Sequence, residues 1–249
     1  MDTIPDQLSY LVLAVLALVD STSIGTLVVP VLLLVTAGAS MSAGRIAVRT
    51  LYYLLVIGLF YFALGLALVA GAMPLFERFG DALVSTPALA VYVAIGVGLV
   101  VWSFYVDPKA IRKRGGDPEE SGRRWITRAR DAAGSFRALT GLALLAGVIE
   151  AASMVPYLAA IGIIVDSGAG IGRAAVILVA YCTVMSLPGI VLALARGLVG
   201  SRLDGLLTRV QYWSIRNAAG ALSWTIGIVG AIVVLYSAPE LLQNLGIAD

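Results

Sequence analysis

The sequence contains no histidine, a single cysteine at position 182 and few charged residues. One cysteine excludes an intrachain disulfide and a dithiol redox cycle within the chain. The absence of histidine argues against a transition-metal site, so we expect neither a metal nor a cofactor. A net charge of +2 gives no reason to expect nucleic acid as a partner.

Charged residues make up 13% of the chain, about half of what a soluble domain carries. Hydrophobic residues make up 60% of the 249 residues, and the mean hydropathy is +0.96. Runs of about 20 apolar residues can cross a bilayer as helices. The sequence therefore predicts an all-α, polytopic membrane protein with six transmembrane helices. Their expected ranges are 8–37, 50–72, 88–105, 139–165, 174–195 and 218–236.

Arginine and lysine are distributed unevenly among the connections between these helices. The connections that would share one side hold 15 of them, and those on the other side hold 2, Arg78 and Arg173. Basic loops stay in the cytoplasm, so both termini should be extracytoplasmic. The first ten residues lack the basic segment of a cleavable signal peptide, and we expect the first helix to remain.

The first expected helix contains the stretch LALVDSTSIGTLVVPVLLLV, residues 16–35, in which a carboxylate and hydroxyl residues interrupt an apolar run. At about 30 residues it is too long for one straight upright helix. We expect it to be tilted or broken near Asp20–Gly25. The polar interruption indicates a site in the protein interior, because lipid does not tolerate a charge there.

Three helices precede the basic connection 107–138 and three follow it, so the second half should insert the opposite way up. Asp20 and Glu150 each lie in the first helix of a half, with a serine three residues later and a proline further on. We therefore predict two inverted three-helix repeats, 1–106 and 139–249, each with a broken or kinked first helix. The connection 107–138 and the segment 201–217 have apolar residues at helical spacing, which favours interfacial helices over coil.

A charged group in the middle of a membrane helix usually faces the protein interior or a water-filled cavity. Two acids at matching places suggest one shared site, in which burial lets a carboxyl group gain and lose a proton as the conformation changes. Alternatively, the acids and hydroxyls only hold the helices together. The predicted substrate- or proton-binding residues are Asp20, Ser21, Thr22, Ser23, Gly25, Thr26, Glu150, Ser153 and Tyr157.

Prolines and tyrosines accompany these residues. Proline removes a backbone donor from a helix, so Pro30, Pro156 and Pro188 are predicted helix-breaking or kinking positions. Tyrosines can line a cavity, or they can anchor the helix ends in the interface. The tyrosines considered are Tyr52, Tyr53, Tyr61, Tyr157 and Tyr181. Cys182 is expected to be a small apolar filler.

The stretches ALVDSTSIGTLVVPVLLL, FYFALGLALVAG and EAASMVPYLAAIGII resemble the glycopeptidolipid- and sulfolipid-addressing proteins, the GAP or Sap family of the LysE superfamily of six-span exporters. The resemblance implies a non-enzymatic protein of the bacterial plasma membrane that helps to move glycolipids toward the envelope. Membrane lipids and a lipid or amphiphile substrate would be its partners, with a larger lipid exporter and a second copy of the chain as further candidates.

A membrane enzyme is disfavoured because the sequence shows no nucleophile–base or metal constellation, and three interpretations remain open. The first is a lipid or amphiphile transporter with alternating access at the two acids. The second keeps this mechanism but exports a small polar solute such as an amino acid. The third is a non-transporting accessory subunit of a larger lipid exporter. A cavity that opens sideways to the bilayer would favour the lipid.

Overall fold

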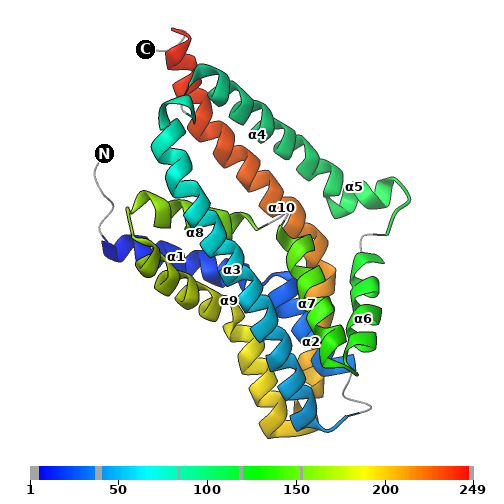
Figure 1. Ribbon diagram of the computed structural model, residues 1–249. Coiled ribbons are helices and arrows are strands. Elements are labelled where there is room, and N and C mark those ends of the chain that lie inside the picture. The colour runs from blue at the N-terminus through cyan, green and yellow to red at the C-terminus, as the bar shows by residue number, and fades with distance from the viewer. Residues whose placement is uncertain (1–5, 37–40, 84, 118–119, 152–153, 247–249) are drawn as a thin grey trace. The chain divides into compact units, whose positions relative to one another are not determined.

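The structure, a computed structural model, describes residues 6–36, 41–83, 85–117, 120–151 and 154–246, in which only helices and their connections occur (Figure 1). The all-α prediction is confirmed. The chain divides into two compact units, Met1–Val69 with Glu119–Ala218, and Ala70–Pro118 with Ala219–Asp249. The elements are α1 (Asp6–Asp20), η1 (Ile24–Val28), α2 (Val29–Thr36), α3 (Ala43–Leu83), α4 (Thr86–Val106), α5 (Pro108–Lys113), α6 (Glu120–Ala132), α7 (Phe136–Ala151), α8 (Val155–Asp166), α9 (Ile171–Val199), η2 (Gly200–Leu203) and α10 (Asp204–Asn244).

Several helices are long and apolar enough to cross a membrane. Four segments of the described chain meet this condition by themselves: Ala43–Gly71, Thr86–Val106, Ile171–Trp213 and Ile226–Asn244. Two further segments are bent pairs of helices, and counting each pair as one span raises the number to six. The described residues therefore contain four to six candidate membrane spans.

The first bent pair joins α1 to η1 and α2 at an angle of 64°. Helix α1 ends at Asp20, and Ser23 then caps the short π-helical segment η1 by accepting a hydrogen bond from the backbone N–H of Thr26. Serine at such a position satisfies a donor that the new helix start would leave unpaired. The predicted break near Asp20–Gly25 is confirmed.

The second bent pair joins α7 to α8 at an angle of 76°. Helix α7 ends one residue after Glu150, and α8 begins at Val155. Pro156 lies in the first turn of α8, where a helix has no use for the missing N–H, so the proline follows the break and starts the new helix. Ser153 lies outside the described residues.

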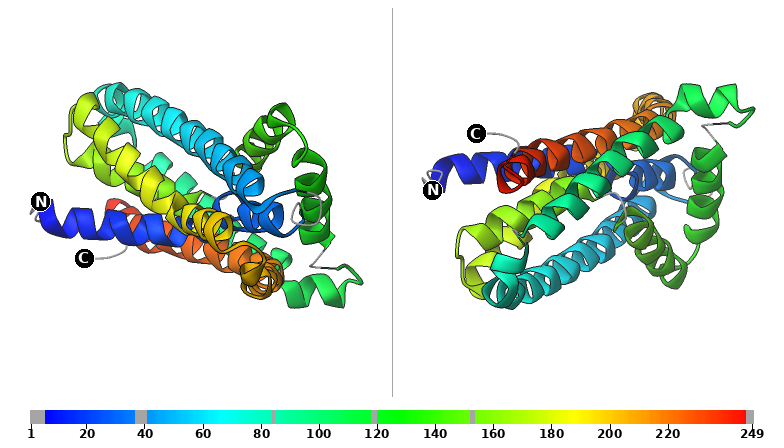
Figure 2. Two further views of the ribbon diagram at one scale, coloured as in Figure 1. Left: turned by 90° about the horizontal axis from the view of Figure 1, so that it is seen from below. Right: turned by 90° about the horizontal axis from the view of Figure 1, so that it is seen from above.

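The two bent pairs pack against each other within the first unit. Helix α1 lies along α8 and α9 (Figure 2). The segment η1 contacts α7 and α9. The first segment of each bent pair thus packs on the second segment of the other. Helix α2 is buried along most of its length, with Val29, Leu32 and Leu34 fully enclosed. Burial on every side places α2 in the core of this unit.

Helix α6 forms within the basic connection, and its apolar side chains face other helices of the first unit. Trp125 and Ala129 are buried, and α6 packs against α2 and α7. The apolar pattern of α6 predicts a buried face, but it does not reveal that α2 and α7 are the helices that cover this face. The second expected interfacial segment forms η2 and the first turns of α10, in which Leu207 is buried and Trp213 exposed.

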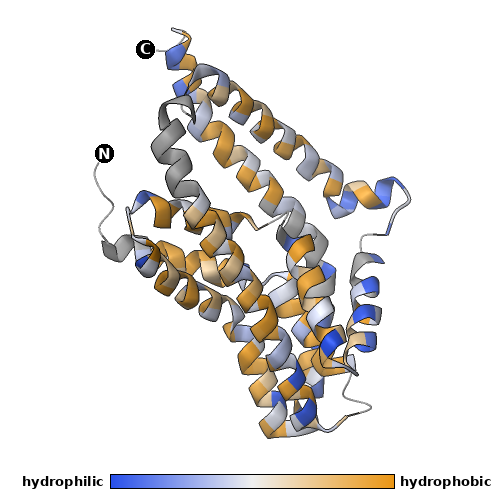
Figure 3. Ribbon diagram, in the orientation of Figure 1, coloured by the Kyte–Doolittle hydropathy of each residue, from blue (hydrophilic) through white to orange (hydrophobic). Residues whose placement is uncertain are grey.

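Arginines gather at one end of this unit. The guanidinium of Arg49 donates to the backbone oxygen of Ala133 and lies 5.5 Å from the ring centroid of Phe136. Arg196 is buried and forms an ion pair with Asp204. Figure 3 shows hydrophilic residues on α6 and at the start of α3, and hydrophobic ones along the middle of α3.

The second unit contains a close crossing of α4 with α10. A Cβ atom at Gly96 would lie 2.9 Å from the backbone oxygen of Gly230, so only glycine permits this approach. The Ser223 hydroxyl donates to the backbone oxygen of Ser103 at 2.9 Å. Small residues and hydroxyl contacts of this kind hold helices together in lipid, where the hydrophobic effect between helices is absent.

Candidate functional site

Glu150 connects the two helix breaks. One carboxylate oxygen accepts a hydrogen bond of 2.9 Å from the backbone N–H of Gly25, and the other accepts one of 2.8 Å from the Tyr61 hydroxyl. The Ser23 hydroxyl and the N–H of Ile24 also lie close to this carboxyl group. Glu150 thus caps the start of the helical segment that follows the first break. The exposed N–H groups of a helix start favour a negative group at this position.

Asp20 is the second buried acid, with 9% of its surface exposed, as for Glu150. The Tyr181 hydroxyl on α9 donates to Oδ2 of Asp20 at 2.6 Å. Asp20 and Glu150 lie close enough for their charges to interact. The structure therefore brings the two predicted acids into one buried cluster, with a separate tyrosine donating to each.

Three tyrosines lie between the two acids. The ring centroids of Tyr61 and Tyr157 are 5.5 Å apart, and those of Tyr157 and Tyr181 are 5.3 Å apart. The Tyr157 hydroxyl donates to the backbone oxygen of Tyr61 at 2.6 Å. The sequence identified Tyr157 as a site residue and the other two only as candidate cavity-lining residues, because pairing across 89 and 161 residues leaves no local signal.

Gly65 is a site-forming residue that the sequence analysis missed. It lies one helical turn after Tyr61 on α3, and a Cβ atom there would collide with the Tyr157 hydroxyl. Glycine at this position lets α8 approach α3 closely enough for the hydrogen bond to Tyr61. The four-residue spacing from Tyr61 was visible in the sequence, but the partner helix was not.

The hydroxyl residues after Asp20 mainly complete the break. Ser21 donates to the backbone oxygen of Leu18 at 2.6 Å, and Thr22 donates to that of Val19 at 2.8 Å. These carbonyl groups belong to the last turn of α1. No helical N–H groups follow that turn to donate hydrogen bonds to them. The roles of Ser21 and Thr22 in the structure are thus local to the end of α1.

Ser23 and Thr26 lie nearer to the acids. Their hydroxyl oxygens are 2.8 Å apart, and the Thr26 hydroxyl donates to the backbone oxygen of Asp20 at 3.0 Å. A Cβ atom at Gly25 would collide with the Glu150 carboxylate and lie 2.5 Å from Cδ1 of Ile57. Gly25 is therefore a position where the two breaks approach each other closely.

The prolines take different positions relative to the breaks. Pro30 is buried near the start of α2, directly after η1. Pro188 lies inside α9, which continues through it to Val199. A Cβ atom at the next residue, Gly189, would lie 2.8 Å from the backbone oxygen of Thr26, so α9 packs closely on η1 at this level.

Tyr53 is fully buried, and its hydroxyl has no hydrogen-bond partner among the residues described. It lies close enough to Glu150 to be affected by the charge of that carboxyl group. A buried polar group without a partner is costly and therefore uncommon. Tyr53 thus places an unused donor beside the acid cluster.

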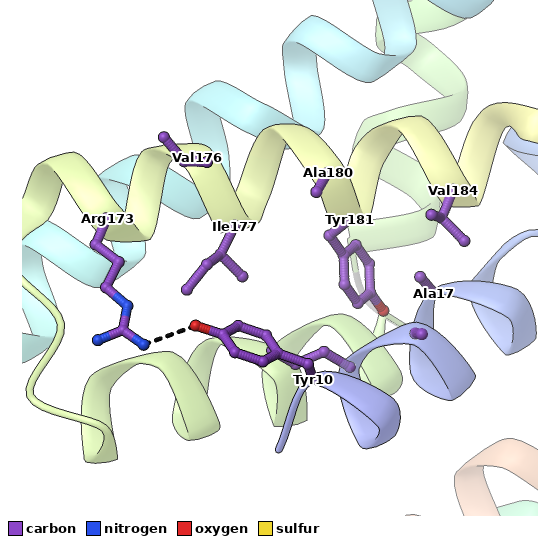
Figure 4. Close-up of a pocket in the computed structure, with 10 residues that line it drawn as sticks. Tyr10, Ala17, Arg173, Val176, Ile177, Ala180, Tyr181 and Val184 are labelled. Atoms are coloured by element: carbon purple, nitrogen blue, oxygen red, sulfur yellow. Dashed lines mark hydrogen bonds between the residues drawn. The ribbon is translucent and has the colours of Figure 1, made fainter. Parts of the chain in front are cut away.

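A pocket of about 390 Å³ lies between α1 and α9 (Figure 4). At one end Arg173 donates a hydrogen bond of 2.6 Å to the Tyr10 hydroxyl. At the other end is Tyr181, the tyrosine that donates to Asp20. The remaining lining residues are Leu13, Ala14, Ala17, Val176, Ile177, Ala180 and Val184. The pocket is thus apolar between two polar ends.

Metal-binding side chains do not cluster in the described part of the chain, where no group of three or more Asp, Glu, His or Cys residues is found. Cys182 is buried next to Tyr181 in α9. The chemistry that this arrangement offers is proton exchange by carboxyl groups, hydrogen bonding by hydroxyls, and apolar contact in the pocket.

A sequence model of the Sap family, described as the sulfolipid-1-addressing protein, matches residues 13–238 of the chain. The chain belongs to this family. The match includes both helix breaks, both acids and all of α9, so the cluster of this Sap-family protein lies inside the shared region. Comparison with curated proteins and with solved structures gives no match.

Proposed function

We propose that this Sap-family protein helps to export a glycolipid or other amphiphile across the bacterial plasma membrane. It would act without enzymatic chemistry, by alternating access at a midplane site that contains Asp20 and Glu150, coupled to proton movement. The observation that supports this most directly is the hydrogen bond between Gly25 and Glu150, which joins the two broken helices. Broken helices that meet at mid-depth are the usual binding site of secondary transporters.

The Gly25–Glu150 contact is sensitive to protonation for a simple reason. An ionised carboxylate accepts strong hydrogen bonds from the N–H groups of a helix start, whereas a neutral carboxyl group accepts weaker ones. Protonation of Glu150 would loosen the contact between the two broken helices, and ionisation would restore it. Tyr53, with its unpaired hydroxyl close by, offers a donor for a second arrangement of Glu150.

The proposed arrangement in the membrane has six spans in two inverted repeats, 1–106 and 139–249, with 107–138 between them and both termini extracytoplasmic. Each first span would be a bent pair of helices, and the reciprocal packing of the two pairs supports this reading. The contacts of Arg49 with Ala133 and Phe136 also support it, because they bring together connections expected on the cytoplasmic side.

A lipid substrate is favoured over a small polar solute by the position of the pocket. Ala14, Val176 and Ala180 line it and are exposed, and Val15 and Val179 beside them are exposed apolar residues. Exposed apolar side chains on a membrane helix face lipid. The pocket thus opens sideways onto the surface that lipid would cover.

Reconstitution tests this function. The purified protein in liposomes should move a labelled glycolipid between leaflets when a pH gradient is applied. Asp20→Asn and Glu150→Gln should each abolish the dependence on the gradient. Asp166→Asn, at the exposed end of α8, is the matched control and should behave like the unmodified protein. An unchanged pH response in both acid variants would remove proton coupling.

Other outcomes would favour the remaining functions. Transport of amino acids without lipid would favour a polar-solute exporter. Failure to move lipid under any gradient, together with co-purification of a larger lipid exporter, would favour an accessory subunit. If the active fraction contains dimeric protein, the transporter works as a homo-oligomer, whether its substrate is a lipid or a polar solute.

A further inference from the structure

The α1–α9 pocket is asymmetric in charge. Arg173 is basic and exposed at one end, and the hydroxyl of Tyr10 lies beside it. At the other end Tyr181 separates the pocket from the buried Asp20. An anionic group would be attracted to the Arg173 end and repelled from the Asp20 end. An amphiphile with a negative head could therefore enter in only one orientation.

The walls between these ends suit a hydrocarbon chain. They consist of alanine, valine, leucine and isoleucine from two helices that lie side by side. A volume of about 390 Å³ is at the lower end of the range for ligand pockets, which suits one chain better than several. A polar solute would find no hydrogen-bonding partner along this middle section.

We propose that the α1–α9 pocket binds one acyl chain of an anionic lipid, with the head group at Arg173 and Tyr10 and the chain directed toward Tyr181. The proposal rests on the proposed function, because it names the class of lipid that would use the site. Arg173 lies on the side expected to be extracytoplasmic, so the bound lipid has its head in the outer leaflet. The pocket is then the position that a lipid occupies as it leaves the protein.

Tyr181 gives this site a connection to the acid cluster. Its ring lines the pocket (Figure 4), and its hydroxyl donates to Asp20. A chain that packs against the ring acts on the same side chain that holds the carboxyl group. Occupancy of the pocket and the hydrogen bonding of Asp20 are therefore coupled through one residue.

The test uses the full-length protein in nanodiscs that contain a photoreactive phosphatidylglycerol or a photoreactive phosphatidylcholine with identical chains. Crosslinked peptides are mapped by mass spectrometry. The anionic probe should label 10–17 and 173–184 about fivefold more than the neutral probe, the effect of one basic residue near an anionic lipid. Arg173→Gln should reduce this preference to that of the neutral lipid, whereas Arg209→Gln, which removes an exposed arginine that does not line the pocket, should retain it.

Filling the pocket provides the second arm. Ala180→Trp should reduce labelling by both probes to the level of the lipid-facing residues outside the pocket, whereas Val179→Trp, at the neighbouring exposed position outside the pocket, should not. Size-exclusion chromatography and thermal unfolding of each variant verify the fold. Equal labelling by the two probes, or labelling that Ala180→Trp leaves intact, would overturn the proposal. So would competition by inorganic sulfate, which would indicate a site for free anions.

The outcome is separable from that of the proposed function. Glu150 does not line the pocket, so Glu150→Gln should abolish gradient-driven transport and leave the labelling unchanged. Labelling as expected without transport in the unmodified protein would retain the lipid site and reject the transporter. Transport without selective labelling would retain the transporter and reject the lipid site.

Discussion

The backbone N–H of Gly25 donates a hydrogen bond of 2.9 Å to the carboxylate of Glu150, although 125 positions separate the two residues. Glu150 belongs to α7, which ends at the second break, and Gly25 belongs to the segment that follows the first break. The bond therefore fixes the two breaks to each other. The first break leaves a helix start with unpaired N–H groups, and the Glu150 side chain of the other broken helix supplies a partner for one of them.

Replacing Gly25 by alanine should damage both stability and transport. The new Cβ atom would collide with the Glu150 carboxylate and press on Ile57, so one of them must move. Overpacking of this kind costs about 1–3 kcal/mol. Thermal unfolding in detergent and the liposome assay measure the two effects. Gly162→Ala, on α8 with nothing within 4 Å of the added carbon, is the control and should be unchanged or slightly stabilised.

The hydrogen bond between Tyr181 and Asp20 should be measurable as a coupling energy. Tyr181→Phe and Asp20→Ala remove the same bond from either side, so the double variant should be more stable than the sum of the single effects by about 1 kcal/mol. Chemical denaturation of the four proteins gives this value. The pair Tyr52→Phe and Asp20→Ala should be additive, because Tyr52 bonds to Thr140 instead. Additivity in the first pair would remove the direct contact.

Tyr53→Phe and Tyr61→Phe should have different effects on stability. Tyr61 donates to Glu150, so losing its hydroxyl should cost about 1 kcal/mol. The Tyr53 hydroxyl has no partner among the described residues, so its removal should leave the free energy of unfolding unchanged or raise it. Transport should fall in both variants if the Tyr53 hydroxyl donates to Glu150 in a second arrangement of that side chain. A Tyr53→Phe variant with full transport would contradict that role.

The single cysteine allows a clean test of orientation. Because Cys182 is the single cysteine, Cys182→Ala gives a background without thiols. In that background Ser167→Cys, between α8 and α9, should react with a membrane-impermeant maleimide on intact cells. Gly134→Cys, between α6 and α7, should react only after permeabilisation. Labelling in the opposite order would invert the expected topology, and labelling of both positions from outside would refute it.

Much of the fold was predictable because it depends on local sequence. Apolar runs and the placement of arginine indicate membrane helices, since hydrocarbon excludes charge and unpaired backbone groups. The break after Asp20 was also visible, because a carboxylate, hydroxyls and Gly25 interrupt an otherwise apolar run. Pro156 was predicted to break a helix, whereas it lies in the first turn of α8. A proline can interrupt a helix or start one, and only the structure distinguishes the two.

The partners of the acids were not predictable in the same way. Nothing near Glu150 in the sequence indicates Tyr61 or Gly25, and nothing near Asp20 indicates Tyr181. The apolar face of α6 was visible in the sequence, but its packing against α2 and α7 was not. In each case the deciding contact joins helices that are far apart along the chain.

The sequence by itself determined that the chain is helical, that it belongs in a membrane, and that each half carries an acid near an interruption in its first helix. These properties follow from hydropathy and helix chemistry, which act over a few turns. Only the tertiary structure decided which donors each acid receives and that an apolar pocket leads to one of them. Those features depend on how α1, α7, α8 and α9 pack, and packing is a property of side-chain shapes across separate helices.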